Sequence, residues 1–364
     1  SEYRIYKRRL HELDGRMGEL AEIKAAAREA AAELNFDEYE SLLRQVDESY
    51  SEMVVRAKEA RARNALLRGR ANDAYEGFVS AAETWRSLDP AHSISKRLEY
   101  HRALFDHGLR FGGSGLERAA DILRPALRAG GCTAQLRARA LQNLANALAN
   151  ISIRSEGTAS LATMDEAIER YEEALLLVSI EHDGDLWAMV QQNLGAALSL
   201  RANWCDDTSE RRIFLGRAIE AFRAALRLRP RESKPLEWAM TTQNVAVTLL
   251  EMANVTPGKD GLVLLGRAEK LLQETLSVRS RDAVPFDWAL TQENLAIVAK
   301  AQAERGSASD RAHHLASASS YVAAALEFFR TEGDTFYQDK ATRLAAEIRR
   351  SVSDSEGRHI ESQQ

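Results

Sequence analysis

The stretch WAMTTQNVAVTL, residues 238–249, decides the fold because two close relatives of it occur in the same chain. These are WAMVQQNLGAAL at 187–198 and WALTQENLAIVA at 288–299, so the three tryptophans lie 51 and 50 residues apart. A catalytic site needs each of its groups once, whereas a stacked architecture needs the same packing surface in every layer. The repetition therefore predicts a body built from stacked, similar units.

Each unit contains two phrases with the same period. The first phrase is QNLANAL (142–148), QNLGAAL (192–198), QNVAVTL (243–249) and ENLAIVA (293–299). The second phrase is MDEAIERYEEALLL (164–177), LGRAIEAFRAALRL (215–228), LGRAEKLLQETLSV (265–278) and LASASSYVAAALEF (315–328). Apolar residues recur in both at i, i+3, i+4 and i+7, which predicts two amphipathic helices per unit. Strand-like alternation is absent, so we expect an all-α fold.

Start and turn signals agree with helical hairpins. Pro235 and Pro285 stand where a first helical turn tolerates a missing N–H group. The segments TPGKDG (256–261) and ERGSASD (304–310) are rich in breakers and predict turns between paired helices.

The second helices repeat a small residue, a bulky residue four later and a small residue seven later. Small residues let two helix backbones approach, and the bulky one fills a groove of the neighbour, so this spacing predicts close helix packing. The alanines that open the pattern are Ala167, Ala218, Ala268 and Ala318, and the fullest copy is completed by Phe222 and Ala225. Weaker copies begin at Ala119 and Ala74.

With Leu194-Gly195, Ala218, Phe222, Ala225 and Pro230, the chain resembles the tetratricopeptide repeat family. The resemblance implies a right-handed α-solenoid of helical hairpins. The units here are about 50 residues long instead of the usual ~34. They are similar to a long-unit bacterial branch whose helices open with P-x-x-W-A-x-T-Q-x-N-L, often the non-catalytic part of larger signalling or defence proteins.

Trp187, Trp238 and Trp288 stand near the start of each first helix. Two roles are open at this point: wedging against the preceding unit, or facing a ligand as an exposed aromatic ring.

The ends of the chain have their own patterns, and we divide it into five parts. Residues 1–68 carry two apolar seams, one from Tyr3 to Leu34 and one from Phe36 to Leu67, which predict a coiled-coil-like helical hairpin. This hairpin either packs within the chain or acts as a homodimerisation arm or docking site. We assign 69–133 to degenerate repeats, 134–330 to long-unit repeats, 331–352 to a capping helix and 353–364 to a disordered tail.

Composition excludes several classes of protein. The 364 residues are 45% hydrophobic and 28% charged, with a formal net charge of −5, and only Arg4, Lys7, Arg8 and Arg9 form a basic cluster. We therefore expect no nucleic-acid partner. Cys132 and Cys205 belong to no Cys/His cluster, and no apolar run would span a membrane. We expect a cytoplasmic protein without a membrane partner, structural metal or cofactor.

No motif for catalysis stands out. TPGKDG lacks the residues of a phosphate loop, and FGGSG (111–115) follows no strand, so both are interpreted as connections. The adjacent His313 and His314 point to different helix faces, which does not suit a shared metal. We expect a protein that is not an enzyme.

One polar feature recurs in every first helix. It comprises Gln142/Asn143, Gln192/Asn193, Gln243/Asn244 and Glu293/Asn294. The family resemblance implies that this helix lines a concave groove, where an asparagine grips the backbone of a bound peptide; Arg139, Asn146, Asn150 and Lys300 would join it. The alternative is an internal ladder in which the amides satisfy each other or a neighbouring carbonyl.

The predicted function is a scaffold or adaptor that binds a protein or peptide segment in its groove. The alternative is the sensing or autoinhibitory module of a multidomain effector with a protease-like or nucleotide-hydrolysing partner domain.

Overall fold

The computed structural model describes the backbone of residues 2–33, 35–128, 132–155 and 158–361. Side chains are described over the same ranges except 2–16, 36, 158, 308 and 355–361. Within these ranges the chain has fourteen α-helices and no strand. The all-α prediction is confirmed. The chain divides into two compact units, residues 1–156 and 157–364.

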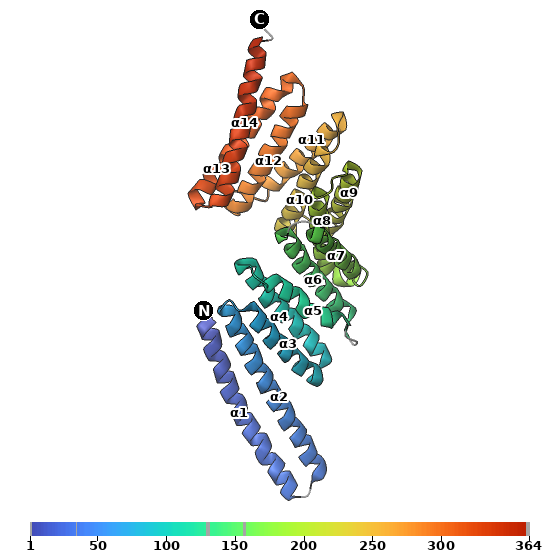
Figure 1. Ribbon diagram of the computed structural model, residues 1–364, viewed down its shortest axis with the longest axis vertical. Helices are drawn as coiled ribbons and strands as arrows, with labels where there is room; N and C mark the ends of the chain where they lie inside the picture. The colour runs from blue at the N-terminus through green and yellow to red at the C-terminus, as the bar shows by residue number, and fades with distance from the viewer. Residues whose placement is uncertain (1, 34, 129–131, 156–157, 362–364) are drawn as a thin grey trace. The chain divides into compact units, whose positions relative to one another are not determined.

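Unit 1 is a succession of antiparallel helices that each pack on the next (Figure 1). The second, fourth and sixth helices also contact one another in turn, as expected for stacked hairpins. The helices are α1 (Glu2–Ala32), α2 (Phe36–Leu67), α3 (Ala71–Leu88), α4 (Pro90–Phe111), α5 (Gly115–Arg128) and α6 (Ala134–Arg154).

Unit 2 contains the long-unit repeats. Its helices are α7 (Thr158–Leu175), α8 (Ile180–Asn203), α9 (Thr208–Leu226), α10 (Pro235–Asn254), α11 (Gly258–Leu276), α12 (Pro285–Arg305), α13 (Ala308–Glu332) and α14 (Thr335–Glu361). Helices α8, α10, α12 and α14 lie side by side, each in contact with the next. The helical hairpins predicted from the 50-residue period are confirmed, and the asparagine-bearing helices of this unit form one continuous row.

The small–bulky–small pattern forms the joints between helices. Ala167, Ala218, Ala225, Ala268 and Ala318 are all fully buried, and Phe222 is 1% exposed. The Phe222 ring lies directly against Gly195 of α8, where any side chain larger than hydrogen would collide with it. Close approach of small residues thus lets the aromatic ring fill the space between two helices.

Helix ends are fixed by side chains from neighbouring repeats of the same compact unit. The Arg305 guanidinium at the end of α12 donates to the carbonyl of Ala253 (2.7 Å) and to Oδ1 of Asn254 (2.9 Å) at the end of α10. In unit 1, Arg154 donates in the same way to the carbonyls of Gly108 (2.7 Å) and Leu109 (3.0 Å). These bonds satisfy the carbonyls that a helix terminus leaves unpaired.

The N-terminal helices form the expected hairpin, but the buried residues differ from the predicted seam. Val46 of that seam is buried, whereas Leu43 and Tyr50 are 41% and 44% exposed. Helix α2 also packs against α3 and α4, so its burial is centred on a second face with Val55 and Ala62. The seam side chains Tyr3, Tyr6, Leu10, Leu13 and Phe36, the seam residue Leu34 and the basic cluster Arg4, Lys7, Arg8 and Arg9 lie outside the described side chains.

The C-terminal helix is longer than the capping helix expected over 331–352. Helix α14 runs from Thr335 to Glu361, and residues 362–364 lie outside the described part. The segment after 352 contains no proline, and its first glycine is Gly357, so no strong stop signal follows Val352.

Candidate functional site

A stripe of accessible side chains runs along α8, α10 and α12 of unit 2, and we call it the open wall. Its residues follow steps of four, three and seven on each helix, which places them on one face. They are half-buried or exposed, whereas residues on the opposite face, such as Leu198, Leu249 and Leu295, are buried. The open wall comprises Met189, Asn193, Ala196, Asn203, Met240, Asn244, Val247, Asn254, Leu290, Asn294, Ile297 and Glu304.

The glutamines of the repeated pair point toward the next repeat. Oε1 of Gln192 accepts a hydrogen bond from the hydroxyl of Thr241 on α10 (2.8 Å). One unit later, Oε1 of Gln243 accepts from the hydroxyl of Thr291 on α12 (3.0 Å). These bonds tie each asparagine-bearing helix to its successor.

A buried arginine completes each of these two links. Arg229 donates to the Thr241 hydroxyl (2.8 Å), and Arg279 donates to Oε1 of Gln243 (2.6 Å). Arg229 is 8% exposed and Arg279 is 3% exposed. Burial lowers the pKa of both guanidinium groups, and the nearby carboxylates Glu237 and Asp287 partly oppose that effect.

Sequence reasoning missed these arginines, although a signal was present. Arg229 and Arg279 each stand 12 residues before the threonine they contact, at the same position of two repeats. At the preceding repeat both positions are apolar, because Val178 and Val190 take the places of the arginine and the threonine, and both are buried. The arginine and the threonine are therefore both present or both replaced in each of these three repeats, as expected of two residues in contact.

The asparagines of the repeated pair stand one residue further round the helix, on the open wall. Asn193, Asn244 and Asn294 are half-buried at equivalent positions of neighbouring helices. The side-chain amides of Asn244 and Asn294 have no hydrogen-bond partner within the described part of the chain. Each therefore presents an unused donor and acceptor on the wall.

The open wall ends in a groove of about 580 Å³ between α10, α12 and α14. Apolar side chains alternate there with charged ones. The groove is lined by Leu250, Asn254, Glu293, Ile297, Lys300, Ala301, Glu304, Phe336, Asp339, Lys340, Arg343, Leu344 and Glu347.

Two ion-pair systems organise the groove. Glu293 is 1% exposed and accepts from Lys340 of α14 (3.0 Å), so the fourth copy of the repeated pair uses a carboxylate in place of an amide. Lys300 lies between Glu304 (3.1 Å) and Glu347 (3.2 Å). Burial disfavours its ammonium, but hydrogen bonds and charges from both carboxylates outweigh burial and raise the pKa of Lys300.

The predicted site residues of the first long repeat belong to α6 in unit 1. Arg139 is exposed, Gln142 is 5% exposed, and Asn143, Asn146 and Asn150 are half-buried. The Asn150 amide donates to the backbone carbonyl of Asn146 (2.8 Å). These residues repeat the pattern of the open wall on a different unit.

The three tryptophans are half-buried at the beginning of their helices. The guanidinium of Arg231 lies 5.2 Å from the Trp238 ring centre, and that of Arg281 lies 5.4 Å from the Trp288 ring centre. Trp288 also packs against the buried cluster that contains Ala289 and Phe329. In these two repeats the tryptophan ring is stacked with an arginine.

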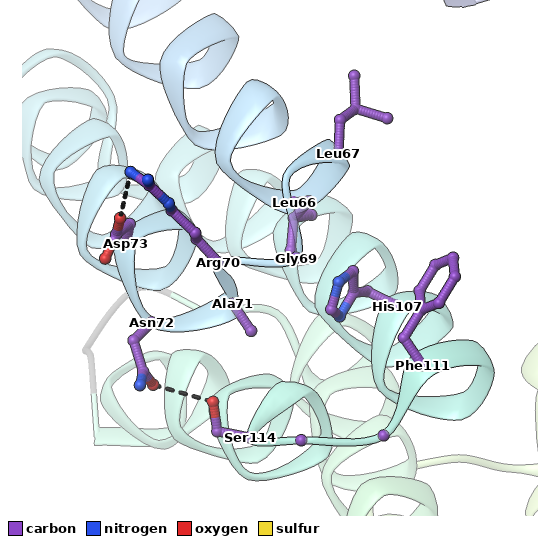
Figure 2. A pocket seen from close by; sticks show the side chains of 12 residues that line it. Leu66, Leu67, Gly69, Arg70, Ala71, Asn72, Asp73, His107, Phe111 and Ser114 are labelled. Carbon is purple, nitrogen blue, oxygen red and sulfur yellow. Dashed lines mark hydrogen bonds and ion pairs between the residues drawn. The ribbon is translucent and has the colours of Figure 1, made fainter.

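A second hollow, of about 800 Å³, lies in unit 1 between the α2–α3 and α4–α5 connections (Figure 2). Leu67 and Phe111 flank it and are 57% and 69% exposed. Ser114 donates to Oδ1 of Asn72 across its edge (3.0 Å). None of the predicted site residues lies here, and the only sequence signal was the connection FGGSG.

Metal-binding and membrane-spanning features are not found in the described residues. No three His, Cys, Asp or Glu side chains of that part of the chain come together as metal ligands. Nor does any described helix combine the length and the apolar character needed to cross a membrane.

Comparisons with known proteins give distant likenesses in fold only. No protein-family model and no curated protein matches the sequence. BtubC (BKLC) from P. vanneervenii is 15% identical, with 82% of this chain and 92% of that chain covered and a TM-score of 0.36. The apo form of RapI is 14% identical, with 82% and 99% covered and a TM-score of 0.39.

A third similar structure is a signal transduction ATPase with numerous domains and a tetratricopeptide repeat sensor, from Pyrococcus horikoshii. It is 12% identical, with 87% of this chain and 48% of that chain covered and a TM-score of 0.42. Likenesses at this level carry no argument about what the chain binds, so function rests on the geometry of the open wall and the groove.

Proposed function

We propose that the open wall and the groove at its end bind an extended segment of another protein, and that the chain is a non-enzymatic scaffold or adaptor. The observation that carries the proposal is the pair of amides at Asn244 and Asn294. They are half-buried, lie at equivalent positions and have no hydrogen-bond partner among the described residues. The adjacent Gln243 and its counterparts instead form contacts between repeats.

An asparagine amide suits the recognition of a peptide backbone. It offers one donor group and one acceptor, which match the carbonyl and N–H of a peptide unit without reading its side chain. Neighbouring packed helices lie about 10 Å apart. An extended chain rises about 3.3 Å per residue, so the two amides would meet peptide groups about three residues apart.

Apolar residues of the open wall and of the groove would supply the contact area between these polar points. Met240 and Phe336 are 38% and 71% exposed, and Ile297 lies in the groove. The wall is held in place by the arginine–threonine–glutamine links, so it is formed before a partner arrives. A preformed surface saves the ordering cost that otherwise weakens binding.

The test replaces the wall amides and compares their loss with that of an adjacent residue whose side chain contacts the next helix of the row. We expect Asn244→Ala combined with Asn294→Ala to weaken binding of a captured partner by about 10–30-fold, from about 1 kcal/mol for each lost hydrogen bond. The unfolding temperature should stay close to that of the parent protein. Partners would be captured from the native host, identified by mass spectrometry and titrated as synthetic peptides.

Gln243→Ala is the matched control. It removes an acceptor of the buried Arg279 but keeps both wall amides, so it should lower the unfolding temperature and reduce peptide affinity per folded molecule less than the double asparagine variant does. The proposal fails if the double asparagine variant binds as well as the parent protein. It also fails if that variant loses as much stability as Gln243→Ala.

The sensing or autoinhibitory module of a multidomain effector is the second interpretation of the sequence. It predicts a catalytic or nucleotide-binding domain in the same native reading frame. Sequencing the native transcript tests it directly.

A further inference from the structure

One face of α2 is accessible along most of the helix, and we call it the hairpin stripe. Its residues are spaced by four and three in alternation, which keeps them on a single face. Leu43, Tyr50 and Val54 are 41%, 44% and 49% exposed. The full stripe is Leu43, Asp47, Tyr50, Val54, Ala57 and Arg61, and all six are exposed.

The other two faces of α2 are already used within unit 1. One packs on α1, whose Lys24 ammonium lies 4.5 Å from the centre of the Tyr50 ring and donates to the Tyr50 hydroxyl, so Tyr50 stands at the border between this contact and the stripe. The other packs on α3 and α4, with Lys58 donating to the Thr84 hydroxyl (2.9 Å) and Val55 fully buried. The residues of the hairpin stripe stay exposed beside these two contacts. Figure 1 shows α1 and α2 as the antiparallel pair of helices at the start of the chain.

We propose that two copies of the chain associate through their hairpin stripes, with the two α2 helices antiparallel about a two-fold axis near Val54. The stripe is complementary to itself in this arrangement. Asp47 and Arg61 are equally far from Val54, so the carboxylate of each copy comes level with the guanidinium of the other at both ends. Tyr50 comes next to Ala57, a large residue against a small one, and Val54 meets its own counterpart.

Charge complementarity is what selects a second copy as the occupant. Asp47 and Arg61 are both exposed, and neither forms an ion pair with another side chain that the structure describes. The reverse, parallel alignment would place Asp47 against Asp47 and Arg61 against Arg61, which like-charge repulsion disfavours. A two-fold interface repeats each favourable contact twice, so one ion pair in the sequence becomes two in the dimer.

The stripe predicts a reversible dimer. From Leu43 to Arg61 the helix covers about 27 Å at 1.5 Å per residue. A contact of this length with three large apolar side chains per copy falls at the small end of specific interfaces, so we expect a dissociation constant on the order of micromolar. The stripe belongs to unit 1 and the open wall to unit 2, so this proposal and the proposed function rest on different residues and are tested by different variants.

The experiment measures the mass of the full chain by light scattering and sedimentation over a wide concentration range. We expect the parent protein to shift from one to two chain masses. Asp47→Arg and Arg61→Asp should each raise the dissociation constant about tenfold or more, because the symmetry places two like-charge contacts in the dimer. The double variant Asp47→Arg/Arg61→Asp restores opposite charges at both ends and should recover the parent affinity.

Glu48→Arg is the matched control. Glu48 is exposed on α2 and lies off the stripe, so its reversal changes net charge equally but should leave the dimer intact. Val54→Glu should abolish the dimer, and circular dichroism checks that every variant keeps its helix content. A parent protein that stays monomeric overturns the proposal. So does a dimer that ignores Asp47→Arg and Val54→Glu, or a double variant that fails to recover.

Discussion

Gly195 is the position where the packing of two repeats leaves the least room. A Cβ atom at this position would lie 2.8 Å from two carbons of the Phe222 ring and 3.0 Å from a third. Contacts this short are repulsive, and Phe222 is 1% exposed, so its ring has little space in which to retreat. Gly195→Ala should therefore destabilise unit 2, although alanine is the better helix former.

The expected magnitude follows from two opposing effects. Inserting a methyl group into a packed joint costs about 1–3 kcal/mol. Replacing glycine by alanine inside a helix gains about 1 kcal/mol. The net change therefore lies between about zero and a loss of about 2 kcal/mol, and each kcal/mol lowers the unfolding temperature of a unit this size by roughly 2–4 °C.

The chain offers a control and a rescue for this substitution. Gly216 lies inside α9, and a Cβ atom there would meet nothing within 4 Å, so Gly216→Ala should raise stability by about 1 kcal/mol or slightly less. The repeat that follows places Ala246 and Leu272 at the positions of Gly195 and Phe222. Gly195→Ala combined with Phe222→Leu copies that pair and should recover most of the lost stability.

Urea and thermal unfolding of the parent protein, Gly195→Ala, Phe222→Leu and the combined variant, followed by circular dichroism, complete a double-mutant cycle. We expect a coupling free energy of at least about 1 kcal/mol between the two positions, as for residues in direct contact. If Gly195→Ala stabilises the protein as Gly216→Ala does, the packing argument for the repeat is refuted. Additive effects of Gly195→Ala and Phe222→Leu would refute it as well.

Two further predictions concern buried polar groups. Burial lowers the pKa of His101 below its ordinary value of 6.5, so the folded state binds fewer protons than the unfolded chain. Unit 1 should therefore lose stability as pH falls below 6.5. His101→Gln should weaken this pH dependence, measured by urea unfolding at pH values above and below 6.5. Arg279→Ala removes the buried arginine that donates to Gln243 and Thr291, and should lower the free energy of unfolding by about 2–3 kcal/mol. Arg281→Ala removes an exposed side chain stacked on Trp288 and should lower it by less than about 1 kcal/mol. Thermal unfolding of the two variants in parallel compares these losses.

The sequence by itself was sufficient for the helical hairpins and for their joints. The 50-residue period, the small–bulky–small spacing and the prolines at 235 and 285 are local patterns, and local patterns decide where a helix begins and which stripe it buries. Ala218 and Phe222 are buried as that spacing predicts.

Sequence periodicity alone could not say which residue of each repeated polar pair faces the candidate site. Gln243 and Asn244 are adjacent, both polar and both repeated, so periodicity gave them the same prediction. Adjacent residues of a helix point about 100° apart, since a turn has 3.6 residues. The direction from which α12 packs on α10 decides that Gln243 contacts the next repeat and that Asn244 stays on the open wall.

The other contacts of the site join residues far apart in the chain. Lys340 reaches Glu293 across 47 positions, and Thr291 reaches Gln243 across 48. The exposed stripe of α2 likewise depends on where α1, α3 and α4 pack around that helix. A periodic sequence fixes which face of a helix is apolar, but polar side chains choose partners by distance and direction. Those are set only when neighbouring helices are in place.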